Sequence, residues 1–289
     1  MISNSSKIPG EITRFAPSPS GRLHLGHAHS ALFAAQAADP GGRFLLRIED
    51  IDVARCRPEF EAAIYRDLAW LGLEWEQPVL RQSERFDLYR DALRQLEARD
   101  LIYPCFCTRK EIAAEIAAAG AAPHGPDGPL YPGTCRRRSV AERRRRLEGG
   151  EAHAWRLDLA KAMEQVGPLT WHERGQGPQQ AQPQLLGDVV LARKDVPTSY
   201  HLAVVLDDAA QGVTLVTRGR DLFVATHVHR LLQALLDLPV PEWRHHDLIS
   251  DASGQRLAKR HDALSLAALR DAGLAPAEVR AKAGFPERA

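Results

Sequence analysis

A short strand, a loop, a helix and a second strand follow one another within about 40 residues near the start of this chain. EITRF is β-prone, and the chain then breaks at Pro17 and Pro19. The alanine- and leucine-rich stretch from about Gly26 has the composition of a helix. GGRFLLRIEDID is an apolar run that ends in acids, as buried parallel strands do. This order predicts a βαβ unit and therefore an α/β fold with a Rossmann-like, doubly wound parallel sheet.

Later segments predict that the same sheet continues after an interruption. A helix is expected from about Pro58 to Leu71, and the character of the chain changes near Leu101. GQGPQQAQPQ has the composition of a linker, and strand-and-helix alternation resumes after it. We therefore expect four parts: a Rossmann-like first half (1–100), an inserted subdomain (101–184), a Rossmann-like second half (185–262) and a short helical tail (263–289).

The composition argues against a membrane-spanning or exported protein but says little about binding partners. With 44% hydrophobic and 26% charged residues, the 289-residue chain is ordinary for a globular protein. It contains no apolar run of about 20 residues and no export signal, so we expect a cytoplasmic protein. Lysine and arginine total 38, and aspartate and glutamate total 37, so the formal charge of +1 does not predict a polyanionic partner.

HLGH stands between the first strand and the first helix, where a doubly wound sheet binds ligands. Gly26 would let a phosphate approach the backbone, and the N-terminus of the helix offers N–H groups and a positive dipole end. His24 and His27 could donate hydrogen bonds to phosphate oxygens as charge builds. These residues predict a nucleotide site, although a purely structural histidine pair would have the same sequence.

SGQRLAKRHD near the other end of the chain is a small, Gly- and Ser-containing loop that carries Arg256, Lys259 and Arg260. A cationic loop of this kind could close on the β- and γ-phosphates of ATP and stabilise the leaving pyrophosphate. The alternative is an exposed basic loop with no ligand.

Five polar residues are expected at one rim of the sheet: Arg14 and Ser18 after the first strand, Glu49 after the second, and Tyr200 and Arg218 on or just after later strands. A guanidinium among them can bind a carboxylate in a fork, which gives charge and planar specificity together. The alternative is that the arginines form ordinary salt bridges, Arg218 with Asp221 or Arg47 with Asp50.

Three of the four cysteines gather in one segment, because Cys105, Cys107 and Cys135 lie close in sequence while Cys56 stands apart. Without an export signal a disulfide framework is not expected, and the clustering indicates a metal. In a regular strand the two thiols of a C-x-C pair point in opposite directions, so a turn must bring them together.

Three thiolates and one further ligand would complete a tetrahedral, structural zinc site, because four protein ligands leave no position for substrate. His124 is the chemically obvious fourth ligand and Tyr131 the unusual one. Three reduced cysteines in a core remain the alternative.

A separate run of seven arginines between Arg136 and Arg146 predicts either a solvated helix face or a contact with a phosphate backbone.

Taken together, HLGH and SGQRLAKRHD resemble the HIGH and KMSKS signatures of class I aminoacyl-tRNA synthetases. The chain is most similar to the glutamyl and glutaminyl group, because RFAPSPSGRLHLGH, RIEDID, YHLAVVLDD and VTRGRDL occur in that group's order. The resemblance implies catalytic roles for His24, His27 and Lys259, which with Gly26 would bind ATP and its Mg²⁺. It also implies a site for L-glutamate, made by the following residues: Arg14, Ala16, Ser18, Glu49, Tyr200 and Arg218. Of these, Arg14 and Arg218 would meet the carboxylates, and Glu49 and Tyr200 would lie near the ammonium.

The pattern C-x-C…Y-x-x-x-C resembles the zinc site of glutamyl-queuosine tRNA(Asp) synthetases, which are truncated relatives of glutamyl-tRNA synthetases. This likeness implies Tyr131 as the fourth ligand of one zinc ion per chain. Only residues 261–289 follow Arg260, so we expect no anticodon-binding domain. The implied reaction activates glutamate without tRNA and transfers it to queuosine in tRNA(Asp), and nothing requires more than a monomer.

Three departures and three rival functions accompany this resemblance. Arg256 and Ala258 replace the first lysine and the serine of KMSKS, and Val204 stands where full-length glutamyl enzymes often have a polar residue. The rivals are a minimal glutamyl-tRNA synthetase that charges a tRNA 3′ end, an inactive zinc- and RNA-binding module, and another nucleotidyltransferase with a HIGH-type loop.

Overall fold

The amino-terminal strands form a three-stranded parallel sheet, in the order β1-β2-β3, in a computed structural model that describes residues 10–38, 41–118, 124–125, 128–249 and 265–286. The pairing runs from Ile12 opposite Arg43 to Phe15 opposite Leu46, which is the predicted βαβ unit. Acidic residues occupy the first turn of α2, where the helix dipole favours them, and Pro58 begins it. The elements of this half are β1 (Ile12–Phe15), α1 (Leu25–Ala38), β2 (Arg43–Ile48), α2 (Pro58–Trp70), β3 (Glu76–Arg81) and a 3₁₀ turn, η1 (Gln82–Arg85).

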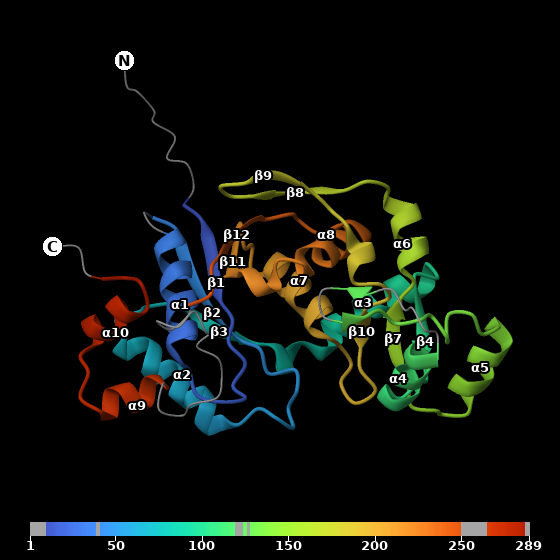
Figure 1. Ribbon diagram of the computed structural model, residues 1–289, viewed down its shortest axis with the longest axis horizontal. Helices are drawn as coiled ribbons and strands as arrows, with labels where there is room; N and C mark the ends of the chain where they lie inside the picture. The colour runs from blue at the N-terminus through green and yellow to red at the C-terminus, as the bar shows by residue number, and fades with distance from the viewer. Residues whose placement is uncertain (1–9, 39–40, 119–123, 126–127, 250–264, 287–289) are drawn as a thin grey trace, which may run out of the picture.

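A second sheet, in the order β11-β12-β8-β9, continues the first one. Strand β11 lies beside β1, and the N–H of Thr214 donates to the carbonyl of Ile12 at 3.0 Å. β11, β12 and β8 are parallel, while β9 is antiparallel to β8 (Figure 1). The elements are β8 (Thr170–Glu173), β9 (Gly177–Gln180), η2 (Pro183–Leu185), α7 (Tyr200–Ala210), β11 (Leu215–Gly219), η3 (Arg220–Leu222), α8 (Ala225–Leu235) and β12 (Glu242–His246).

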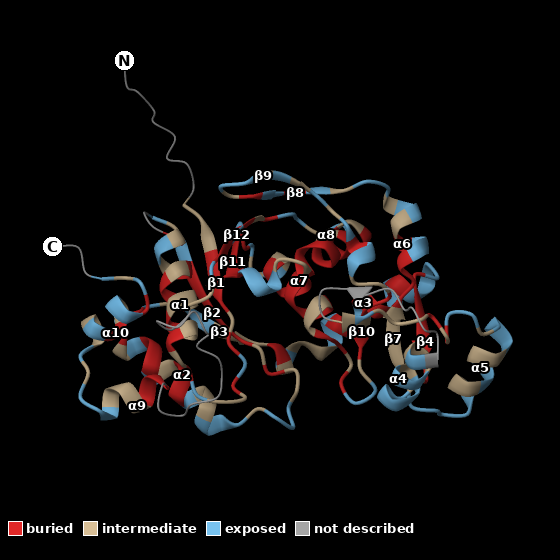
Figure 2. Ribbon diagram, viewed as in Figure 1, coloured by how far each residue is buried: buried red, intermediate tan, exposed pale blue. Residues whose placement is uncertain are grey.

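Two expectations about this half were wrong. The stretch predicted as a linker contains strand β9, because Gly175 and Gly177, both with positive φ, close a tight turn that pairs β9 with β8. Tyr200 begins a helix rather than lying on or after a strand. Leu202 to Asp208 of that helix, α7, are all buried (Figure 2), and such a run has no amphipathic period by which a helix could be told from a strand.

The segment between the two sheets builds a module of its own around an antiparallel sheet, in the order β10-β7-β4. Strands β8 and β9 fall inside the expected range 101–184 but belong to the second sheet. Strand β10 falls in the expected second half (185–262) but belongs to this antiparallel sheet. The elements around this sheet are α3 (Phe86–Ala98), β4 (Ile102–Cys105), α4 (Arg109–Ala118), β5 (His124–Gly125), β6 (Gly128–Pro129), α5 (Val140–Glu148), β7 (Ala154–Leu157), α6 (Leu159–Val166) and β10 (Val190–Ala192).

Two large hydrophobic clusters hold these parts together. One contains α1, β1, β2 and α2, and the other joins α3, β4 and β10 to α7 and α8. Val204 lies in the second cluster with 1% of its surface exposed, so it packs in the core rather than facing a ligand. At the carboxyl end the predicted pair of short helices is present as α9 (Leu266–Asp271) and α10 (Pro276–Lys282). No helix within the described part of the chain has the length and apolar character needed to span a membrane.

Candidate functional site

A cavity of about 500 Å³ opens where β1, β2 and β11 end and where α1 and α7 begin. Nine residues singled out from the sequence line it: Arg14, Ala16, Ser18, His24, Gly26, His27, Glu49, Tyr200 and Arg218. They come from segments up to about 200 residues apart, which meet because parallel strands end at one edge of a sheet. Lys259, with its neighbours Arg256 and Ala258, lies outside the described residues.

The HLGH segment presents two imidazoles at the start of α1. The ring centroids of His24 and His27 are 3.8 Å apart. The Nδ1 atom of His24 accepts from the N–H of Gly26 at 3.1 Å, and Nδ1 of His27 accepts from the N–H of His24 at 3.2 Å. With Nδ1 accepting, each neutral ring carries its proton on Nε2. Both histidines are thereby prepared as Nε2–H donors beside the N-terminus of a fourteen-residue helix.

Gly26 leaves little room for a side chain beside His24. A Cβ atom at this position would lie 3.1 Å from Cε1 of His24, tighter than nine in ten real contacts of that kind. A larger residue would therefore require the imidazole to shift by a few tenths of an ångström.

Arg14 and Glu49 belong to a buried ion cluster that includes two residues not selected from the sequence. Asp208 accepts from Nε of Arg14 at 2.9 Å and from Nη1 of Arg47 at 2.7 Å. Arg47, which is fully buried, also contacts Glu49 at 3.3 Å. Its partner is not Asp50, which accepts from Ser83 instead.

The protonation states of this cluster follow from burial and pairing. Burial raises the pKa of Glu49 above its ordinary value, although Arg47 and Arg14 oppose the shift. Burial also acts against ionised Asp208, but Arg14 and Arg47 outweigh it and hold the pKa of Asp208 below its ordinary value. Asp208 is therefore the firmly charged carboxylate that two guanidiniums share.

Arg218 is buried among neutral partners. Its Nε donates to Nε2 of His245 at 3.1 Å, its Nη1 lies 3.1 Å from the hydroxyl of Tyr200 and 3.1 Å from Nδ1 of His229, and its Nη2 donates to Thr226 at 2.7 Å. Within the described residues it contacts no carboxylate, so the alternative of an Arg218–Asp221 salt bridge was wrong.

Burial and the charge of Arg218 keep the surrounding histidines neutral. Burial lowers the pKa of His201 to about 4, and Arg218 adds to the effect. The pKa of His229 lies well below its ordinary value for the same two reasons. The cavity wall thus holds a guanidinium whose direct hydrogen-bond partners are all uncharged, which suits an incoming carboxylate.

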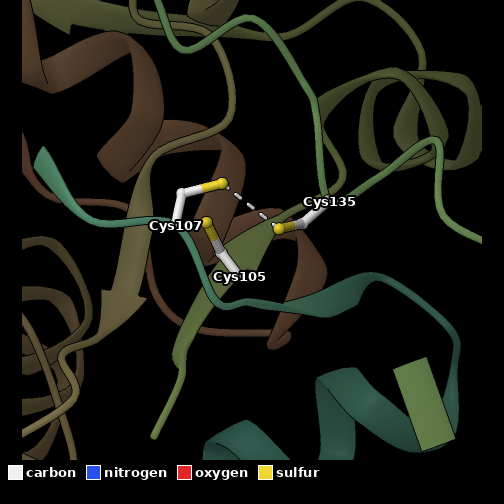
Figure 3. A group of neighbouring side chains, drawn as sticks. All are labelled: Cys105, Cys107 and Cys135. Carbon is white, nitrogen blue, oxygen red and sulfur yellow. Dashed lines mark hydrogen bonds between the residues drawn. The ribbon is translucent and has the colours of Figure 1, made fainter. Parts of the chain in front are cut away.

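Three cysteine thiols converge in the module beyond the sheet, as Figure 3 shows. β4 ends at Cys105, so Cys107 leaves the strand and turns back, as the C-x-C spacing predicts. The sulfur atoms of Cys105, Cys107 and Cys135 lie within 4.8 Å of one another, with 3.4 Å between Cys107 and Cys135. Cys56 lies elsewhere, 3.8 Å from Ser18.

The phenolic oxygen of Tyr131 lies beside these thiols. It is 3.3 Å from Sγ of Cys105 and 3.6 Å from Sγ of Cys107, and it accepts from the N–H of Cys135 at 2.9 Å. Hydrogen bonding by the neighbouring thiols, above all Cys105, lowers the pKa of Cys135. Three sulfurs and one oxygen at such spacing form a donor set that fits a tetrahedral metal ion.

The arginine run is a largely solvated surface. Helix α5 has no buried residue and lies at one end of the molecule (Figure 1). Several arginines of the run pair with acids of the same module, as Arg137 does with Glu115. Arg144 and Arg145 are exposed at the surface.

Known proteins are similar to this chain in sequence and in fold. Residues 12–281 match the family model of class I tRNA synthetases (E and Q), catalytic domain. The chain is 53% identical to the glutamyl-Q tRNA(Asp) synthetase of Rhodobacter capsulatus, over 95% of this chain and 100% of that protein. It is 46% identical to the enzyme of that name from Symbiobacterium thermophilum, over 92% of this chain and 83% of the relative.

A solved glutamate tRNA ligase from Elizabethkingia meningosepticum, in complex with its amino acid, superposes with a TM-score of 0.74 at 30% identity. The match covers 88% of this chain and 52% of the ligase, so the chain spans about half the length of that structure.

Proposed function

Because the chain belongs to the glutamyl and glutaminyl group of class I tRNA synthetases, and within it to the glutamyl-Q tRNA(Asp) synthetases, we propose that it joins L-glutamate to queuosine of tRNA(Asp). The reaction uses ATP in two steps. Glutamate is first activated as glutamyl-adenylate, without any tRNA, and the glutamyl group is then transferred to the modified base in the anticodon loop.

The observation that carries this proposal is the single cavity that has the HLGH imidazoles on one wall and buried Arg218 on another. Arg14 and Arg47 share Asp208, Arg47 also contacts Glu49, and buried Arg218 contacts no carboxylate among the described residues. A buried guanidinium without an acidic partner suits glutamate, which carries two carboxylates and one ammonium. We assign the ligand's carboxylates to Arg14 and Arg218 and its ammonium to the neighbourhood of Glu49 and Tyr200.

The first step needs positioning and charge stabilisation and no protein nucleophile. An oxygen of the glutamate α-carboxylate attacks the α-phosphorus of ATP, the bond to the β-phosphate oxygen breaks, and pyrophosphate leaves. The Nε2–H groups of His24 and His27 donate to the phosphate oxygens as negative charge develops. We assign Lys259 to the departing pyrophosphate. Mg²⁺ bound with ATP supplies further neutralisation of the phosphates.

In the second step a hydroxyl of the queuosine cyclopentenediol attacks the carbonyl carbon of the adenylate. An ester forms, and AMP leaves with the electron pair of the broken bond.

We also propose that Cys105, Cys107, Tyr131 and Cys135 hold one zinc ion. What supports this is the approach of three sulfurs and one phenolic oxygen in a module that has only a small core cluster of its own. A site closed by four protein ligands leaves no position for substrate, so the ion stabilises the module rather than taking part in the chemistry.

The test is glutamate-dependent exchange of labelled pyrophosphate into ATP without tRNA, followed by transfer of labelled glutamate to tRNA(Asp) with and without queuosine. Exchange without tRNA and transfer only to the modified tRNA are the expected results. Charging of a tRNA(Glu) 3′ end would show a minimal glutamyl-tRNA synthetase instead. Absence of exchange under all conditions would show an inactive module.

A further inference from the structure

Two more buried polar residues lie next to Arg218 on the neighbouring strands of its sheet, one on β12 and one on β8. His245 is the direct neighbour of Arg218 in the parallel pairing of β11 with β12. Glu173 ends strand β8, and its two oxygens lie 2.8 Å from the N–H of His245 and 2.8 Å from Nδ1 of the same residue. The side chains of His245 and Glu173 are 0% and 1% exposed. A continuous chain of hydrogen bonds thus runs from Glu173 through His245 to Arg218.

The two outer groups, Glu173 and Arg218, determine the direction of both hydrogen bonds to His245. A carboxylate can only accept and a guanidinium can only donate. His245 must therefore carry its proton on Nδ1, facing Glu173, and present the lone pair of Nε2 to the Nε–H of Arg218. The Nε–H goes to His245, the two hydrogens of Nη1 face Tyr200 and His229, and one hydrogen of Nη2 goes to Thr226. The guanidinium therefore keeps one Nη2–H to offer a ligand.

We propose that Glu173 and His245 are positioning residues for the carboxylate receptor Arg218. Glu173 selects the tautomer of His245, and His245 holds the plane of the guanidinium so that its remaining Nη2–H meets a carboxylate of the amino acid. This inference rests on the proposed function, because it takes the ligand to be glutamate.

The charge states of the three groups agree with this arrangement. Burial opposes ionisation of Glu173, but the hydrogen bonds from His245 outweigh it and hold the pKa of Glu173 below its ordinary value. Burial lowers the pKa of His245, with Arg218 acting in the same direction and Glu173 opposing it. A charged carboxylate, a neutral imidazole and a charged guanidinium therefore coexist without repulsion.

Glu173 has a second, purely structural role that the test must separate from positioning. Strand β8 ends at this residue, and the carboxylate accepts from the backbone N–H of His245. Glu173→Gln keeps the shape and can keep that bond, because the amide oxygen can accept from the backbone. The amide NH₂ then faces Nδ1 and forces the proton of His245 to Nε2, where it opposes the Nε–H of Arg218.

Two substitutions at His245 provide a matched pair. The amide of His245→Gln reaches the position of Nε2 and can accept from Arg218, whereas the amide of His245→Asn reaches the position of Nδ1 and can only preserve the contact with Glu173. Both remove the same ring from the core. Asp67→Asn serves as a control, because Asp67 is another buried carboxylate, 2.6 Å from Arg270 and apart from the cavity-lining residues.

Calorimetric titration with glutamate alone, ATP–pyrophosphate exchange kinetics and thermal unfolding of each full-length variant test the inference. Glu173→Gln and His245→Asn should weaken glutamate binding roughly 10- to 100-fold, the cost of misdirecting a hydrogen bond to a charged group, and leave the KM for ATP unchanged. His245→Gln should bind glutamate close to wild type, and Asp67→Asn should lower only the melting temperature. ¹⁵N spectra should show the Nδ1–H tautomer of His245 in the wild type and the Nε2–H tautomer in Glu173→Gln.

The outcomes distinguish the two levels of the argument. Wild-type protein that binds no glutamate would overturn both the proposed function and this inference. If wild type binds glutamate and Glu173→Gln, or both His245 variants, bind it with the same affinity as wild type, the inference alone is overturned. If Glu173→Gln does not fold, the contrast between His245→Gln and His245→Asn still decides.

Discussion

Asp208 is the residue whose removal we expect to cost the most stability, because it accepts from both Arg14 and Arg47. The side chains of Arg14 and Arg47 are 5% and 0% exposed, so neither guanidinium can turn to water when its partner is lost. Asp208→Asn keeps the shape but leaves two buried cations facing a neutral amide. Breaking a buried pair in this way costs about 3–5 kcal/mol, which corresponds to a fall in melting temperature of roughly 6–10 °C for a chain of this size.

The matched control is Asp207→Asn, one residue earlier in the same helix. Asp207 is equally buried, but its ionic partner Arg85 is 26% exposed and can be solvated after the substitution. We therefore expect a smaller loss in Asp207→Asn. Urea unfolding of both variants at pH 7, followed by circular dichroism, gives the free energies of unfolding. Equal losses in the two variants, or a loss below about 1 kcal/mol in Asp208→Asn, would refute the reasoning.

The stabilisation by Asp208 and its two arginines should depend on pH. The pKa of Asp208 is held below its ordinary value, since Arg14 and Arg47 outweigh the effect of burial. A depressed pKa contributes stability that is present above the unfolded value, about 3.9, and is lost as pH falls through the folded value. The stability difference between wild type and Asp208→Asn should therefore stay constant down to about pH 4 and narrow below it. A difference that narrows already between pH 7 and pH 5 would contradict this assignment.

Three further predictions concern the proposed reaction, the metal and the RNA. Lys259→Ala should reduce pyrophosphate exchange by about 10²- to 10³-fold, as loss of a charge-stabilising donor does, while glutamate binding changes little; equal losses in both would show that the loop has another role. Cys135→Ser should release zinc and lower the melting temperature of the module, and metal analysis that still finds one ion per chain would contradict the ligand set. Replacing exposed Arg144 and Arg145 by alanine should leave pyrophosphate exchange unchanged but weaken tRNA binding. The slope of log affinity against log salt concentration should fall by the equivalent of about one to two phosphate contacts. An unchanged slope would show that α5 contacts no phosphate.

Local pattern was sufficient for much of the nucleotide side of the site. The βαβ unit could be predicted because the composition of each segment and the prolines mark each boundary within a few residues. HLGH could be placed at the edge of the sheet because strand, loop and helix are adjacent in the chain. The turn that reunites Cys105 with Cys107 follows from the alternation of side chains along a strand.

Helix α7 marks the limit of such reasoning. Its apolar residues are buried on every side between two parts of the molecule, so the sequence has no polar face to reveal a helical period. The same burial brings Asp208 to Arg14 and Arg47, which lie 194 and 161 positions away. No local signal identifies these partners, although a pair of acids that ends an apolar run indicates that something must neutralise them.

The sequence by itself determined which chemistry is present: imidazoles at a helix start, guanidiniums and carboxylates near strand ends, and thiols at a turn. These choices are local, because residue type and spacing set hydrogen-bonding capacity and secondary structure. Only the tertiary structure decided which charges neutralise one another. Asp208 accepts from two arginines and leaves Arg218 among neutral partners, and Glu173 reaches His245 from a stretch that the sequence placed in the inserted subdomain. The physical reason is that burial makes pairing obligatory, and long-range packing selects the partners.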